Sequence, residues 1–153
     1  MIVVSDTSPI TALITVRQVE LLQELFDEMF VPQAVQTELL RTHATLPTWI
    51  HTQEVAATRD LKRFSEIVDA GEAEAIALAK EMHADRLLID ERKGRRLALA
   101  EGIHVIGLVG VVLLAKRKGR ILSARVVMDR LVNEAGVYLD PELVNSALQS
   151  VGE

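Results

Sequence analysis

Short runs of consecutive apolar residues alternate along the chain with longer segments whose apolar residues recur every three or four positions. A consecutive apolar run is typical of a strand that is buried on both faces, and the longer recurrence is typical of an amphipathic helix. The strands predicted in this way are Ile2–Ser5, Met29–Val31, Leu87–Ile89 and Ile103–Ile106. A further short strand, Trp49–Thr52, is considered within a long loop from Arg41 to Arg59.

Helix boundaries are suggested by local capping residues. Ser8 and Pro9 are suited to the N-cap and the first helical position of the first helix, and Gly94 is expected to open the helix that follows Asp90. The helices predicted are Pro9–Val16, Val19–Phe26, Pro32–Leu40, Asp60–Val68, Glu72–Met82, Gly94–Glu101, Leu108–Arg117, Ala124–Glu134 and Pro141–Val151. Strands that alternate with helices predict an α/β fold with a mostly parallel sheet, in which ligands bind beyond the carboxyl ends of the strands.

Length and composition narrow the class of protein. With 153 residues, the chain is expected to form one domain over residues 1–153, with a core over 1–120 and C-terminal helices over 123–151. There is no cysteine, which excludes disulfides and thiolate metal sites and fits a reducing cytosol. The longest apolar stretch, Ile103–Ala115, is too short to span a bilayer, and the first residues do not resemble a signal peptide. A cytoplasmic protein without a membrane partner is expected.

Four carboxylates occupy positions at which the surrounding apolar residues predict burial rather than exposure to solvent. Asp6 follows the first predicted strand and Asp90 follows Leu87–Ile89 directly, so both lie at carboxyl ends of strands. Glu38 and Glu72 each occupy a helical stripe whose other members are apolar. Acids gathered at one end of one sheet repel one another, and a hard divalent cation relieves that repulsion. The pattern therefore predicts a metal-dependent enzyme.

Each of these acids has neighbours that could share or replace its role. Glu74 and Glu91 are second candidates beside Glu72 and Asp90, and the hydroxyls of Thr7 and Ser8 could assist a metal or a phosphate. The alternatives are structural: Asp is common at strand-to-helix turns, and Glu is favoured near a helix N-terminus.

The charge distribution bears on the partner. The net charge of −5 argues against nucleic acid, but ten of the 17 Lys and Arg residues fall between Arg92 and Arg130. Such local basic runs can contact phosphates, although they also suit helix C-termini, and both interpretations stay open.

The sequence lacks the motifs of several other kinds of catalytic or binding site. The four histidines have no ligand-like spacing, and no Gly-rich phosphate loop or G-x-S-x-G turn is present. An aspartyl-nucleophile phosphohydrolase would require a second Asp two residues after Asp6, where the chain has Ser8. Trp49 by itself provides no aromatic platform for stacking single-stranded nucleic acid.

Four ordered motifs carry a resemblance to a known family. They are Ile-Val-Val-Ser-Asp-Thr-Ser-Pro-Ile, Val-Pro-Gln-Ala-Val-x-x-Glu-Leu, Gly-Glu-Ala-Glu-Ala-Ile-Ala-Leu-Ala and Leu-Leu-Ile-Asp-Glu. The chain from Ile2 to about Leu114 resembles PIN-domain proteins, and among them the compact branch related to VapC-type toxins of toxin–antitoxin pairs. Many relatives have Asp-Phe after an Asn in the last motif, whereas this chain reads Ile-Asp-Glu-Arg-Lys.

The resemblance implies a three-layer α/β/α sandwich that cuts RNA with Mg²⁺ or Mn²⁺. Carried over by position, the acids of the family correspond to Asp6, Glu38, Glu72 and Asp90, which would bind the metal. The family also places a basic residue near this site, for which Arg95 and Arg96 are candidates. Together with Arg92 and Lys93 they would hold the RNA backbone.

The resemblance also implies partners. These are RNA, a small antitoxin protein and a second copy in a homodimer, with the amphipathic C-terminal helices either forming the dimer interface or covering the sheet. The rival hypothesis is a degenerate PIN-like module that binds RNA or a partner protein without cleaving.

Overall fold

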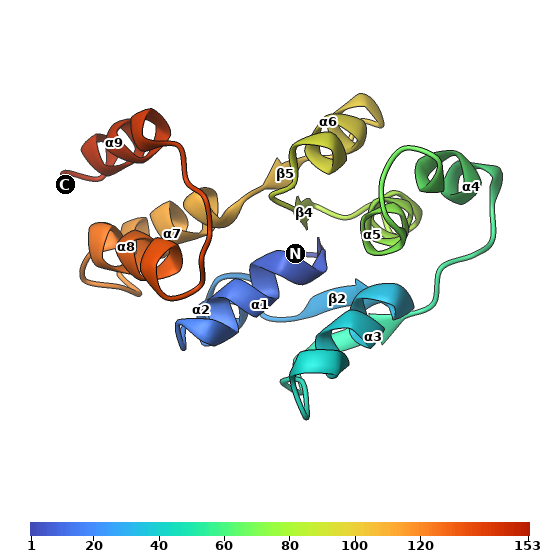
Figure 1. The fold of residues 1–153 in the computed structure, drawn as a ribbon, viewed down its shortest axis with the longest axis horizontal. Helices are drawn as coiled ribbons and strands as arrows, with labels where there is room; N and C mark the ends of the chain where they lie inside the picture. Colours follow the sequence, from blue (N-terminus) through green and yellow to red (C-terminus); the bar gives the residue numbers. More distant parts are fainter.

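Five short parallel strands form the centre of the molecule (Figure 1). The computed structural model describes residues 1–153. The sheet has the order β3-β2-β1-β4-β5. The strands are β1 (Val3–Ser5), β2 (Met29–Pro32), β3 (Ile50–Gln53), β4 (Arg86–Leu88) and β5 (Val105–Ile106).

Nine helices surround the sheet (Figure 1). They are α1 (Thr7–Thr15), α2 (Glu20–Phe26), α3 (Gln33–Thr42), α4 (Arg59–Ser65), α5 (Ala70–Glu81), α6 (Arg92–Ala100), α7 (Leu108–Arg117), α8 (Ala124–Asn133) and α9 (Pro141–Ser150). The predicted alternation of strands and helices is thereby confirmed.

Alternating strand residues divide the core into two clusters. Val3 and Leu88 belong to one hydrophobic cluster with residues of α1, α2, α3, α7, α8 and α9, whereas Val4 and Leu87 belong to another with residues of α4, α5 and α6. Since successive strand residues point to opposite faces, the two clusters lie on the two sides of the sheet. The molecule is therefore a three-layer α/β/α sandwich, as the resemblance implied.

The long loop after α3 contains a strand, as considered from the sequence. β3 begins at Ile50, one residue later than expected, and pairs in parallel with β2, with Ile50 opposite Met29. β3 forms the edge of the sheet, opposite β5.

Three predicted helix starts are two residues too late: α5, expected from Glu72, begins at Ala70, and the starts of α1 and α6 also differ. α1 begins at Thr7 with Asp6 at its N-cap position, so Pro9 occupies the third helical position, where its missing N–H costs no hydrogen bond. α6 begins at Arg92 with Glu91 at its N-cap, and the Glu91 carboxylate accepts a 2.7 Å hydrogen bond from the N–H of Gly94. Ser8 and Gly94 are thus helical residues rather than boundaries.

The C-terminal helices pack on the first cluster. Val127 and Leu131 of α8 and Leu148 of α9 are buried there, whereas Val126 and Leu143 on the same helices are exposed. These helices therefore cover the sheet and still present apolar residues outward. No helix in the structure has the length and apolar composition needed to cross a membrane.

Candidate functional site

Asp6 and Asp90 lie at the carboxyl ends of neighbouring strands. β1 pairs with β4 so that Ser5 is opposite Leu88, and the N–H of Asp6 donates to the Leu88 carbonyl oxygen at 2.9 Å. Although Asp6 occupies the N-cap position of α1, its side chain makes no capping hydrogen bond, and the residue is only 5% exposed. The local fold therefore places a buried carboxylate here that does not serve as a helix cap.

Asp90 is anchored through one oxygen only. Its Oδ1 accepts a 3.1 Å hydrogen bond from the N–H of Leu108 at the start of α7, whereas its Oδ2 is buried without a hydrogen-bond partner. Burial raises the pKa of Asp90, and the Leu108 N–H and the charge of Arg95 partly oppose that rise. Oδ2 is therefore the atom of this side chain that is available to a cation or a proton.

Asp90 and Arg95 can pack against the backbone of residue 107 because that residue is glycine. A Cβ on Gly107 would lie 2.7 Å from Asp90 Oδ1 and 2.8 Å from Arg95 Nη1. The same Arg95 nitrogen donates to the Ile89 carbonyl oxygen at 2.8 Å, so the guanidinium is fixed beside the acid. Any residue larger than glycine would have to displace one of these charged groups.

Glu72 stands in the first turn of α5 and is only 8% exposed. Burial, the neighbouring Asp69 carboxylate, and then the charges of Asp6 and Glu91 raise the pKa of Glu72 to about 9. Gly94 lies close by, since a Cβ there would be 3.1 Å from Glu72 Oε2. The interaction with Asp6 joins α5 electrostatically to the end of β1.

Glu38 reaches the site from α3. Its Oε2 accepts a 2.6 Å hydrogen bond from the Thr7 hydroxyl, and its Oε1 would lie 2.7 Å from a Cβ on Gly71. Burial and, to a smaller extent, the charges of Asp69, Glu38 and Asp90 raise the pKa of Asp6 to about 6, against the lowering effect of a hydrogen bond from the Thr7 N–H. All four predicted acids therefore belong to one electrostatic cluster around Asp6.

The chemistry of this cluster fits a hard cation, since every donor is a carboxylate oxygen. The buried Asp90 Oδ2 and the raised pKa values of Asp6 and Glu72 also favour added positive charge. In the arrangement described, however, no three His, Asp or Glu side chains are close enough to hold one ion. Closer approach of the carboxylates would increase their mutual repulsion.

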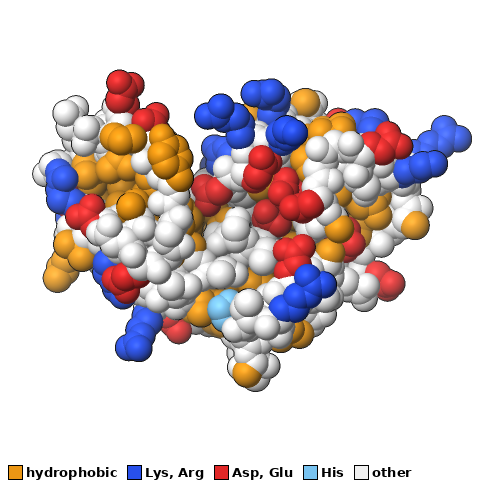
Figure 2. Space-filling model, viewed as in Figure 1, with side chains coloured by type: hydrophobic (Ala, Val, Ile, Leu, Met, Phe, Trp, Pro, Cys, Tyr) orange, Lys and Arg blue, Asp and Glu red, His pale blue; other side chains and the backbone are white.

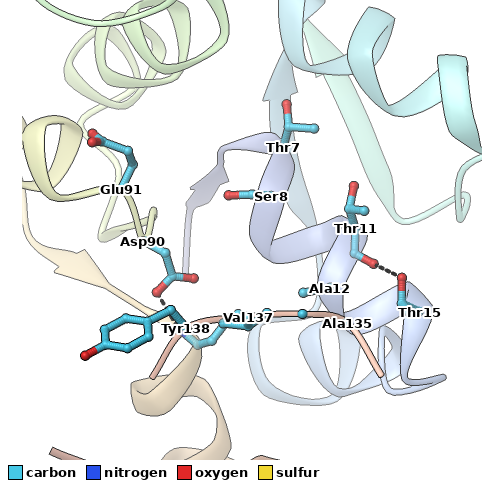
Figure 3. Close-up of a pocket in the computed structure, with 12 residues that line it drawn as sticks. Thr7, Ser8, Thr11, Ala12, Thr15, Asp90, Glu91, Ala135, Val137 and Tyr138 are labelled. Atoms are coloured by element: carbon cyan, nitrogen blue, oxygen red, sulfur yellow. Dashed lines mark hydrogen bonds between the residues drawn. The ribbon is translucent and has the colours of Figure 1, made fainter. Parts of the chain in front are cut away.

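The secondary candidates separate into different roles. Thr7 orients Glu38, and Ser8 is exposed in a hollow of about 550 Å³ that Asp90 and Glu91 also line (Figure 3). Glu91 caps α6 through the Gly94 N–H. Glu74 turns to α3, where its Oε1 accepts a 3.2 Å hydrogen bond from the Ala34 N–H, and so supports that helix.

Asp69 belongs to the cluster but was not predicted from the sequence. It is the N-cap of α5, its Oδ1 accepts a 2.8 Å hydrogen bond from the Glu72 N–H, and its charge raises the pKa of both Glu72 and Asp6. The available signal was an Asp three residues before Glu72, which is a typical N-cap spacing.

Basic side chains lie beside the acids. Arg92, Lys93 and Arg96 are exposed on α6, immediately after the Asp90 turn, and Arg95 is half-buried against Asp90. Figure 2 shows acidic side chains gathered at the centre of one face, with Lys and Arg side chains along the upper rim. A polyanion could therefore approach the acids along a cationic border.

Comparison with known proteins identifies the family of this chain. A family model described as a PIN domain matches residues 2–153, which is nearly the whole chain. No curated protein matches it in sequence. PIN domains have a nuclease-type fold and are typically nucleases, and the carboxylate cluster stands at the end of the sheet where such folds bind ligands. The chain belongs to the PIN-domain family.

Proposed function

We propose that this protein is a metal-dependent endoribonuclease that hydrolyses RNA phosphodiester bonds in the cytoplasm, as the toxin of a toxin–antitoxin pair. The observation that carries the proposal is the carboxylate cluster at the carboxyl ends of β1 and β4, in which Asp6 and Glu72 are buried and Asp90 is half-buried. Asp6, Glu72 and Asp90 come from three separate elements, all have raised pKa values, and Asp90 Oδ2 has no partner.

Asp6 and Asp90 would be the central ligands of Mg²⁺ or Mn²⁺, with Glu38 and Glu72 as outer or second-metal ligands. Such an ion, when bound, acidifies a water molecule and neutralises charge that develops on the phosphate. The protein contributes the position of each ligand: the Leu108 N–H anchors Asp90, and the Thr7 hydroxyl holds Glu38.

The carboxylates and the basic residues of α6 would carry the remaining steps of the reaction. The attacking water loses a proton to a carboxylate of the cluster and its oxygen bonds to phosphorus, while the leaving oxygen departs with the electron pair of its bond and takes up a proton from solvent. Arg92, Lys93 and Arg96 would bind phosphates of the RNA backbone, which gives affinity without sequence preference. Arg95, held against Asp90, would act nearest the scissile phosphate.

The test is cleavage of a mixed structured RNA by the purified chain in EDTA, Mg²⁺ or Mn²⁺, beside Asp6→Asn. The expected result is cleavage that depends on the metal and is lost in the variant. Mn²⁺ binding measured by electron paramagnetic resonance provides a readout that is independent of activity. Cleavage that persists in EDTA, or an Asp6→Asn variant with full activity, would contradict the proposal.

A second candidate function has one observation in its favour. Because no three acidic or histidine side chains are close enough for one ion, a PIN-fold module that binds RNA or a partner without cleavage is the rival. An unreactive wild type that binds RNA equally well in EDTA and Mn²⁺ would favour this rival.

The toxin assignment has its own test. An antitoxin should copurify with the chain or inhibit its cleavage, and expression of the chain alone should arrest growth unless Asp6 is replaced. We also propose a homodimer, for which the exposed Val126 of α8 is a candidate contact. Sedimentation equilibrium of the wild type and of Val126→Asp would test that interface.

A further inference from the structure

A second groove begins at the candidate site and runs between β5, α7 and α9. It has a volume of about 680 Å³, and Asp90, Arg92 and Arg95 line the end that meets the acids. Ile106, Leu113 and Leu139 supply much of its apolar lining. The groove is therefore an apolar surface that continues directly from the carboxylates.

Tyr138 stands where the two hollows meet. It lines both the hollow beside α1 and the groove beside α7, and Asp90 also lines both. Its side chain is the single tyrosine of the chain and is 84% exposed, in the segment between α8 and α9 (Figure 3). An aromatic ring so exposed is not part of the core, and its flat faces are available to a ligand.

Positive charge flanks the groove at both ends. Arg92 and Arg95 line the end at Asp90, and at the other end Arg117 donates to the hydroxyl of Ser150, which lies on the groove wall, at 3.4 Å. The one acid of the wall besides Asp90 is Asp140, and it caps α9 by accepting a 3.2 Å hydrogen bond from the Glu142 N–H. The groove thus combines an apolar floor, an exposed aromatic ring and arginines on either side.

We propose that Tyr138 and this groove form a nucleobase subsite, in which an unpaired base of the RNA stacks on Tyr138 next to the phosphate bound by Arg92 and Arg95. The subsite rests on the proposed ribonuclease function and specifies its substrate as single-stranded RNA. A base offers an apolar face for the ring and the groove floor, and its flanking phosphates match Arg92, Arg95 and Arg117. A base inside a duplex is already stacked and cannot enter.

Continuity and charge favour RNA over a protein occupant. A partner helix would satisfy the apolar floor, but it would match Arg92 and Arg95 only if it carried acidic side chains in the same register. A polyanion that reaches Asp90 past Arg92 and Arg95 would place its next nucleotide at the groove entrance. The alternatives, a partner protein or a second copy, are outcomes of the test below.

The chain offers a direct spectroscopic test, because it has one tryptophan and one tyrosine. Tyr138→Trp combined with Trp49→Phe puts the only indole at the groove, whereas the parent protein keeps Trp49 beside β3, at the opposite edge of the sheet. Both proteins carry Asp6→Asn to prevent cleavage and are titrated in Mg²⁺ with a short single-stranded RNA and with the same RNA as a duplex. Anisotropy of labelled RNA measures binding independently.

The expected result is quenching of the groove indole by the single strand at concentrations well below those needed for the duplex, with little change at Trp49. Tyr138→Ala should weaken single-strand binding about tenfold, as loss of one stacked base would. Tyr138→Phe should bind like the parent, because stacking needs the ring and not the hydroxyl. Unchanged melting temperatures would show that the variants fold.

Two results would overturn the subsite and are distinguishable from failure of the ribonuclease proposal. RNA that binds without quenching the groove indole, and with normal affinity for Tyr138→Ala, overturns the subsite but leaves the ribonuclease intact. A Tyr138→Ala variant that is impaired only in dimer formation, or only in capture of a copurifying protein, also overturns the subsite, because the groove would then be a protein interface. An absence of RNA binding in every variant, together with an absence of cleavage by the wild type, would overturn both proposals.

Discussion

The hydroxyl of Thr7 donates a 2.6 Å hydrogen bond to Oε2 of Glu38, and this bond joins the first turn of α1 to α3 at the carboxyl end of the sheet. Thr7 follows Asp6 directly, so one turn of chain both presents a buried carboxylate and orients a second one. Without the hydroxyl, Glu38 would keep its charge but lose its position.

We expect Thr7→Val to lower the turnover of RNA about tenfold, because Glu38 would then sample other rotamers. Thr7→Ser retains the hydroxyl and should keep turnover within about threefold of the wild type. Initial rates at saturating Mn²⁺ measure this difference. Equal turnover in the two variants would show that the hydrogen bond has no role in cleavage.

Gly71→Ala tests the position of Glu38 from the other side. The new Cβ would lie 2.7 Å from Glu38 Oε1, which is the mobile end of a long side chain, so the carboxylate should move and the backbone should stay. Alanine also favours the helix by up to about 1 kcal/mol over glycine. We therefore expect an unchanged or higher melting temperature together with slower cleavage.

A double variant separates this effect from a general loss of activity. Glu38→Asp shortens the carboxylate and leaves space for the Cβ at position 71. Gly71→Ala combined with Glu38→Asp should therefore lose less activity than the product of the two single losses. Strictly multiplicative losses would contradict a direct contact between the two positions.

The buried acids predict how stability depends on pH in the absence of divalent cations. Burial and neighbouring carboxylates hold the pKa of Glu72 at about 9 in the folded state, against an ordinary value of 4.5. The folded protein therefore binds this proton more tightly than the unfolded chain does. Its stabilising effect is complete below about pH 4.5 and is lost as the pH rises towards 9.

Glu72→Gln should remove much of that dependence. We expect its free energy of unfolding in EDTA at pH 8 to exceed that of the wild type by about 1–3 kcal/mol, because the wild type must take up a proton on Glu72 to fold at this pH, whereas glutamine needs none. Urea denaturation at pH 5 and pH 8 measures this. Glu81→Gln, at an exposed position of the same helix, is the control, and it should follow the wild type at both pH values.

Divalent cations should offset the free-energy cost of ionising these acids in the folded protein. Mn²⁺ added at pH 8 should raise the melting temperature of the wild type and release protons, because the carboxylates must ionise to bind it. Glu72→Gln and Asp6→Asn should show a smaller rise. A metal-induced rise of equal size in all three proteins would place the ion elsewhere.

Glu74 should behave differently from Glu72, although the two are only two residues apart. Its carboxylate accepts a hydrogen bond from the Ala34 N–H, so Glu74→Ala should lower stability by about 1 kcal/mol and leave Mn²⁺ affinity unchanged. Glu74→Gln keeps an acceptor oxygen and should match the wild type in both. If Glu74→Gln lost Mn²⁺ affinity, Glu74 would be a ligand of the ion.

The local errors of the sequence analysis have a common origin. Asp6 and Ser8 are both good N-cap residues, and so is Glu91 when its side chain reaches the Gly94 N–H, so the sequence offers competing helix starts. At α1, the pairing of β1 with β4 continues to Asp6, whose N–H donates to the Leu88 carbonyl oxygen, so Asp6 stays extended and the helix begins directly after it. Local propensity contains no information about such a partner.

The sequence by itself determined the layered fold and the convergence of Asp6 with Asp90, because consecutive apolar strands between helices form a parallel sheet whose carboxyl ends meet. Only the tertiary structure decided the finer roles: Asp69 in the cluster, Glu74 outside it, and Tyr138 at the groove. These roles depend on contacts between elements that are distant in sequence. Distances of a few ångströms there decide which hydrogen bonds form and how far the pKa values of the acids shift. Hydrophobic periodicity predicts the face of a helix or strand on which a residue lies, but tertiary packing decides which residues that face contacts.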